Sequence, residues 1–184
     1  MKLQKFGIKL FFELNKSYIA KSFISVFHNW IQEKSIQDHL LIDVADYSHM
    51  LDGPGVMLIG HEGNFSLDQE NNNYGLLYMR KTMIEGDFTY RFNKVLSILT
   101  DAANRLKDDN YFSYINNSFR FISNDRLNAV NTIENQELYK EKIEKIFKKK
   151  YPNSIVRFED FSSVDERLAF SIKLNNEISI LDYK

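Results

Sequence analysis

The apolar residues between positions 88 and 106 recur at the i, i+3, i+4 and i+7 spacing of one face of a long α-helix. The stripe consists of Phe88, Phe92, Val95, Leu96, Leu99, Ala102, Ala103 and Leu106. Asp87 stands directly before it and is suited to cap the helix. Because strand-like patterns lie both before and after this helix, the sequence predicts an α+β fold with the helices on one main sheet.

The other elements are shorter and are indicated by apolar runs and turn residues. Amphipathic spacing predicts helices at 23–31 and 135–150, and apolar runs predict strands at 8–13, 40–46, 56–61, 75–81, 119–122, 154–159 and 168–174. Residues 65–68 could extend or pair with the strand at 56–61, and 177–182 could form a short strand or a tail. A Gly-Pro-Gly turn at 53–55 separates two strands, since glycine permits positive φ and proline restricts it.

The order of these elements repeats along the chain. Strand, helix, strand, strand is the order in residues 6–68 and again in 117–175, and the strand and long helix of 75–107 link these two pseudo-repeat halves. We therefore predict an α+β fold in a single domain over 1–184. It would contain two βαββ-type modules around a mostly antiparallel sheet with about three helices. Such pairs of modules often leave a groove between them.

Composition excludes several classes of function. The 184 residues carry a formal net charge of -1, which argues against nucleic acid as a partner because nucleic-acid binding usually needs a basic surface. No apolar run reaches the roughly 18 residues that span a bilayer, so no membrane association is expected. The chain has no cysteine, which excludes disulfides and thiolate chemistry. No signal peptide is evident at the N-terminus, and we expect a cytoplasmic protein.

Glycines and titratable side chains concentrate between Asp43 and Asp68. This stretch holds four of the seven glycines and two of the four histidines. Its candidate catalytic residues are His49, His61, Asp43, Asp46 and Glu62. On a regular strand Asp43 and Asp46 would point to opposite faces, whereas His49 and His61 could meet on adjacent strands across the Gly-Pro turn.

Three interpretations of this stretch stay open. The carboxylates could bond backbone amides in the turn; the group could bind manganese, iron or zinc; or it could perform acid–base or ligand chemistry without a metal. No HExxH, HxH or EF-hand spacing is present, so no metal ligands are assigned and no cofactor is named.

A second set of polar residues is a candidate for ligand binding. Tyr78 and Arg80 lie on the same side of their expected strand, and Asp125 and Arg126 follow the strand at 119–122. The arginines could bind an anionic group through two parallel hydrogen bonds. His28, at the margin of the apolar face of the first helix, completes this set.

The run from Val26 to Asp68 resembles an uncharacterised family of small soluble bacterial proteins. The matching segments are Val26-Phe27-His28, Trp30-Ile31-Gln32, Leu41 to His49, Gly53-Pro54-Gly55 and Gly60-His61-Glu62, followed by Leu77-Tyr78, Arg80-Lys81 and Asn124 to Leu127. This resemblance implies no activity. The paired βαββ order also resembles the small-molecule-binding GyrI-like domains, but only by analogy of fold, which does not define function.

The leading functional expectation is a small-molecule-binding module. Its polar groove would be lined by the Asp43–Glu62 region, Tyr78, Arg80 and the Asp125–Arg126 turn. The first alternative is a hydrolase or lyase, with or without a metal, in which His49 or His61 acts as general base beside a carboxylate. The second is a homodimeric interaction module that pairs through an exposed edge strand, such as the C-terminal one.

Overall fold

An eight-stranded antiparallel sheet is the centre of the computed structural model, which describes residues 3–15, 19–107, 111–159 and 166–183. The strands are β1 (Phe6–Leu14), β2 (Leu41–Tyr47), β3 (Gly55–Gly60), β4 (Gly63–Asp68), β5 (Gly75–Arg80), β6 (Phe112–Ser123), β7 (Val156–Glu159) and β8 (Ala169–Leu174). In the described part of the chain the α-helices are α1 (Phe23–Glu33), α2 (Phe88–Leu106) and α3 (Ile133–Lys150). The predicted α+β class, antiparallel sheet and three helices are confirmed.

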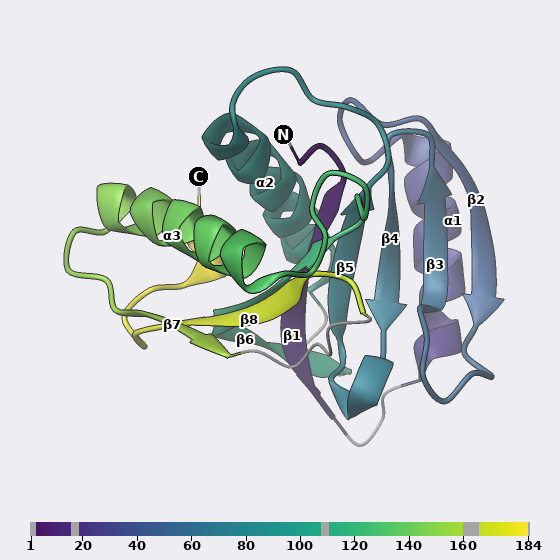
Figure 1. Ribbon diagram of the computed structural model, residues 1–184. Coiled ribbons are helices and arrows are strands. Elements are labelled where there is room, and N and C mark those ends of the chain that lie inside the picture. Colours follow the sequence, from purple (N-terminus) through teal and green to yellow (C-terminus); the bar gives the residue numbers. More distant parts are fainter. Residues whose placement is uncertain (1–2, 16–18, 108–110, 160–165, 184) are drawn as a thin grey trace.

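The strand order is β2-β3-β4-β5-β1-β6-β8-β7, with β5 and β1 at the centre (Figure 1). From β1 the chain crosses through α1 to the edge strand β2 and then returns inward through β3, β4 and β5. From β6 it crosses through α3 to the opposite edge strand β7 and returns through β8. Strand, helix, strand, strand is therefore the order in both halves, but β4 and β5 add two strands to the return path of the first half.

All three helices cover one face of this sheet. The strand register aligns Ile8 with Tyr78 on one side and with Phe121 on the other, and the side chains of all three are buried. Trp30 of α1 contacts Phe65, while Phe88 of α2 contacts Phe121. Each large apolar side chain buried here contributes roughly 1.5–3 kcal/mol, so this aromatic layer holds the helices on the sheet.

Local sequence signals define where two of the helices begin. Asp87 caps α2 as predicted, because its carboxylate accepts a hydrogen bond of 2.7 Å from the amide of Tyr90. Thr132 caps α3 through the amide of Asn135 at 3.3 Å, so α3 begins before residue 135, where the apolar pattern alone places its start.

Residues 63–68 form the strand β4, which pairs with β3 as one of the two expected arrangements had it. Other elements differ from the expectation. Strand β6 begins at Phe112, because its polar residues 116–118 interrupt the apolar pattern without ending the strand. Residues 180–182 form a short 3-10 helix, not a strand. The last strand of the chain, β8, lies between β6 and β7, so it is not an edge strand.

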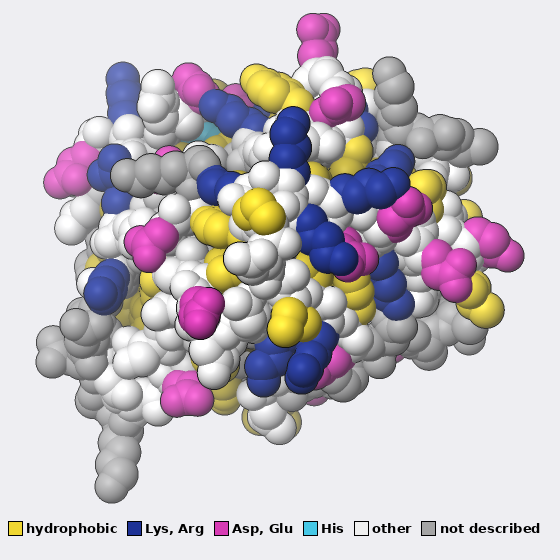
Figure 2. Space-filling model, turned by 90° about the vertical axis from the view of Figure 1, so that its left-hand side faces the viewer, with side chains coloured by type: hydrophobic (Ala, Val, Ile, Leu, Met, Phe, Trp, Pro, Cys, Tyr) yellow, Lys and Arg dark blue, Asp and Glu magenta, His cyan; other side chains and the backbone are white. Residues whose placement is uncertain are grey.

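The surface beside α3 has the charge pattern of a solvated helix. Lys148 pairs with Glu144 at 2.6 Å, and Lys145 pairs with Glu141 one turn earlier. Figure 2 shows basic and acidic side chains intermixed over this side of the molecule, with hydrophobic side chains scattered between them. This face therefore presents no uniformly basic surface of the kind that nucleic acids require.

Candidate functional site

A row of polar side chains crosses the helix-free face from the inner strand β1 to the edge strand β7. Alternate residues of a strand point to opposite faces, so Lys9 points away from the core that receives Ile8 and Leu10. The register pairs Lys9 with Arg120, Arg120 with Ser171, and Ser171 with Glu159. Residues paired across neighbouring strands lie within reach of one another. Four strands thus bring one polar row together from distant parts of the sequence.

Lys9 and Asp68 form a buried ion pair beside this row. Lys9 is 0% exposed and Asp68 is 7% exposed. Burial lowers the pKa of the Lys9 ammonium, and attraction to the Asp68 carboxylate opposes that shift. Gly75 makes room for the lysine, because a Cβ at that position would lie 2.9 Å from Lys9 Cε. The pair neutralises a buried lysine that would otherwise be strongly unfavourable.

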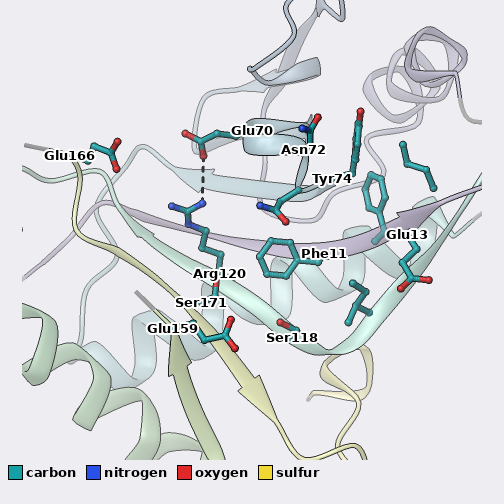
Figure 3. A pocket seen from close by; sticks show the side chains of 14 residues that line it. Phe11, Glu13, Glu70, Asn72, Tyr74, Ser118, Arg120, Glu159, Glu166 and Ser171 are labelled. Atoms are coloured by element: carbon teal, nitrogen blue, oxygen red, sulfur yellow. Dashed lines mark ion pairs between the residues drawn. The ribbon is translucent and has the colours of Figure 1, made fainter. Parts of the chain in front are cut away.

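Arg120 lies next to this pair and is incompletely hydrogen-bonded. Its side chain is 10% exposed, and one of its terminal nitrogens lies 3.8 Å from the nearer carboxylate oxygen of Glu70. Its Nε atom is buried and has no hydrogen-bond partner among the described residues. Figure 3 shows Arg120 between Glu70 on one side and Glu159 and Ser171 on the other. A buried guanidinium with an unused donor is uncommon, because each unsatisfied group is costly.

Arg120 lines two cavities on this face. The larger has a volume of about 880 Å³ and is lined by apolar groups of Phe11, Tyr74 and Ile115, by hydroxyls of Ser118 and Ser171, and by carboxylates. The smaller, of about 430 Å³, is lined by the turn at Asp52-Gly53-Pro54. Glu70 and Glu166 also border both cavities. The arrangement can hold a small organic molecule against the central strands.

The predicted pairing of His49 with His61 is wrong. In the β2–β3 hairpin, Tyr47 pairs with Gly55 and Leu41 pairs with Gly60. His49 therefore follows one end of this hairpin and His61 the other, roughly 20 Å apart along six residues of strand. The physical reason is the antiparallel register: a residue beside the connecting turn cannot meet a residue at the far end of the same strand.

The two aspartates satisfy backbone amides, as the simplest interpretation proposed. Asp43 accepts a hydrogen bond from the amide of Val44 at 2.7 Å, and Asp46 accepts one from the amide of Ser48 at 2.9 Å. They point to opposite faces of β2, and Asp46 also forms an ion pair with Lys21 at 3.6 Å. Hydrogen bonds from Ser48 lower the pKa of Asp46. Among the described residues no three His, Asp or Glu side chains form a group that could bind a metal.

Tyr78 and Arg80 do lie together, but under the helices. The Tyr78 hydroxyl lies 2.7 Å from Nε2 of His39 and receives a hydrogen bond of 3.2 Å from Arg80. His39 Nδ1 lies 2.9 Å from the Gln37 carbonyl, so it carries the proton and Nε2 accepts from Tyr78. Glu62 accepts a hydrogen bond from the backbone amide of Leu40 at 2.7 Å nearby. Because Tyr78 is 0% exposed, this network stabilises the core and does not present a groove.

The remaining candidates are dispersed. Asp125 accepts hydrogen bonds from the side chain of Asn128 at 2.9 Å and so stabilises its own turn. Arg126 lines the smaller cavity, together with Asp52-Gly53-Pro54 of the Asp43–Glu62 region. His28 is exposed on α1, which lies on the opposite face of the sheet.

Sequence reasoning missed His39, Lys9 and Arg120. For the last two a signal was present: each is a single basic residue inside a strongly apolar strand, in Ile8-Lys9-Leu10 and in Phe119-Arg120-Phe121. A charged residue within such a strand points to the face opposite its apolar neighbours. There it must either be exposed to solvent or pair with another polar group. His39 has no comparable pattern around it.

Comparison with known proteins adds no family assignment: neither a protein-family model nor a curated protein matches this chain. No helix in the described ranges is both long and apolar enough to cross a bilayer.

Proposed function

We propose that this protein is a small-molecule-binding module whose ligand occupies the larger cavity on the helix-free face. The observation that carries the proposal is Arg120, whose nearly buried guanidinium borders the cavity and meets Glu70 only in an ion pair of 3.8 Å, too long for a hydrogen bond. An acceptor atom of a ligand would accept a hydrogen bond from a terminal nitrogen of this guanidinium.

The walls of the cavity support the same proposal. Phe11, Tyr74 and Ile115 offer apolar contact, while Ser118 and Ser171 offer hydroxyls. Binding sites for small molecules are concave, mostly apolar, and carry a few placed polar groups. The volume of about 880 Å³ suits a small organic molecule.

A blocked cavity tests the proposal. The purified protein would be examined by native mass spectrometry for co-purifying ligands and by ligand-observed NMR against a mixture of small polar and aromatic fragments. Ser118→Trp places an indole in the cavity. Ser113→Trp is the matched control, because Ser113 is an exposed residue of the same strand.

We expect fragments to bind the wild-type protein and the Ser113→Trp control, and to lose binding in Ser118→Trp. Binding that is equal in all three proteins would place the ligand elsewhere, and no binding by any fragment would remove the proposal. Circular dichroism of both variants would verify that they remain folded.

The two alternatives receive less support from the geometry. A hydrolase or lyase that combines His49 and His61 at one site is not supported, because the β2–β3 register separates the two histidines. The homodimer stays a prediction. Its edge strand would be β2 or β7, because these strands lie at the two ends of the sheet, and analytical ultracentrifugation would test it.

A further inference from the structure

We infer that the ligand of the larger cavity is an organic cation: an amine on an apolar body about the size of an aromatic ring, with an oxygen acceptor that Arg120 binds. This inference rests on the proposed function and names the chemical class of its ligand. Three features of the cavity carry it, namely its charge, its apolar wall and the guanidinium of Arg120.

The described side chains that line the cavity carry a net negative charge, although the whole protein is nearly neutral. Among the described residues that line it, the carboxylates of Glu13, Glu70 and Glu159 stand against one guanidinium, that of Arg120. Lys9 does not change this balance, because Asp68 neutralises it. Concave surfaces lined by one sign of charge concentrate ligands of the opposite sign. An amine would therefore be attracted, and an organic anion would be repelled.

Glu70 is suited to receive the cationic group. Its side chain is 51% exposed, and its contact with Arg120 is an ion pair of 3.8 Å without a hydrogen bond in the described structure. An ion pair at this distance whose carboxylate is exposed contributes little free energy. The Glu70 carboxylate could therefore rotate toward an incoming amine at little cost. Glu159, at the end of the polar row, offers a second carboxylate on the opposite side of Arg120, as Figure 3 shows.

The apolar wall defines the body of the ligand. Phe11 and Tyr74 line the same cavity as the carboxylates, and Ile115 of β6 adds a third apolar side chain. The ring of Phe11 already has one cation near it, since Lys9 Nζ lies 5.8 Å from its centroid. Aromatic rings stabilise organic cations through the negative face of the ring, so an amine on an apolar body matches this wall.

Arg120 defines the remaining group. Its guanidinium can donate to a ligand, but a ligand carboxylate there would lie between the carboxylates of Glu70 and Glu159. A neutral acceptor, such as a hydroxyl, ether or carbonyl oxygen, satisfies the donor without that repulsion. The ligand is therefore a cation with a neutral oxygen, and not a carboxylate or phosphate.

Three probes of nearly equal shape isolate the charge: tyramine is the cation, 4-ethylphenol is neutral and 4-hydroxyphenylacetate is the anion. Binding would be followed by ¹⁵N NMR, including the Nε–H resonance of Arg120. We expect tyramine to shift that resonance and to bind about tenfold or more tightly than the anion, with the neutral probe between them. Added salt should weaken tyramine binding and leave 4-ethylphenol nearly unchanged.

Glu159→Gln removes one carboxylate while preserving shape, and should weaken tyramine binding several-fold without affecting 4-ethylphenol. Glu137→Gln, at an exposed position of α3, is the control. Equal binding of all three probes, or tighter binding of the anion, would overturn the inference while the proposed function stands. If none of the three binds although fragments do, the inference is again overturned. If fragments also fail, the proposed function falls with it.

Discussion

Lys9 of β1 and Asp68 of β4 form an ion pair on the helix-free face of the sheet. The ammonium is fully buried and the carboxylate nearly so. Buried pairs contribute little net stability relative to apolar residues, but the loss of one partner leaves a charge that neither water nor protein compensates.

Lys9→Met should therefore destabilise the protein by about 3–5 kcal/mol, because Asp68 stays buried without its counter-charge. The double variant Lys9→Met/Asp68→Asn should recover most of that loss. Lys5→Met is the matched control at an exposed position and should change stability by less than about 0.5 kcal/mol. Urea unfolding measures all four proteins. A loss below about 1 kcal/mol for Lys9→Met alone would contradict the account.

Gly55 should tolerate no side chain. Its φ is +57°, and a Cβ there would lie 2.3 Å from the backbone oxygen of Leu67, which no side-chain rotation relieves. Left-handed backbone alone costs a non-glycine residue about 1–2 kcal/mol, so Gly55→Ala should lose at least about 2 kcal/mol. Gly53→Ala is the control, because its Cβ would meet nothing closer than 3.4 Å. Thermal unfolding that lowers the Tm equally for both variants would argue against this explanation.

Tyr78→Phe should cost about 1–2 kcal/mol, because it removes the hydroxyl between His39 and Arg80 and leaves their polar atoms short of a partner in a buried place. Tyr90→Phe makes the same chemical change at a residue that is 57% exposed and should be almost neutral. Chemical denaturation compares the two. Equal effects would show that the buried hydroxyl contributes nothing specific.

His39 should make the protein less stable in mild acid. Burial lowers its pKa below the ordinary 6.5, and the positive charge of Arg80 lowers it further, whereas Gln37, Glu62 and Asp38 partly oppose the shift. Below pH 6.5 the unfolded chain therefore binds more protons than the folded protein. Stability is fully present above this value and falls as the pH drops from it toward the lowered pKa.

The free energy of unfolding, measured at about pH 7.5 and about pH 5.5, should fall less in His39→Gln than in the wild type. His28→Gln, at an exposed position of α1, should behave as the wild type does. Imidazole titration by NMR gives an independent measurement. A His39 pKa above 6.5 would reverse the expected sign.

The candidate site shows why local patterns were insufficient. The Asp43–Asp68 stretch is rich in glycine and histidine because it makes two hairpins in succession, β2–β3 and β3–β4, and tight connections need glycine. His49 and His61 are close in sequence, but the length of strand β3 separates them in the structure. Arg120 and Glu70 are far apart in sequence, yet they form an ion pair and both line the cavity.

The sequence by itself determined most of the elements and the face of the sheet to which their residues point. The apolar stripe of 88–106 matches α2 from Phe88 to Leu106, because helical periodicity depends on neighbouring residues alone. Strand alternation likewise separates Lys9 from Ile8 and Leu10. Only the tertiary structure decided that Lys9 faces Asp68 and pairs with Arg120. Strand order and register depend on how the whole core packs, so no local pattern contains them.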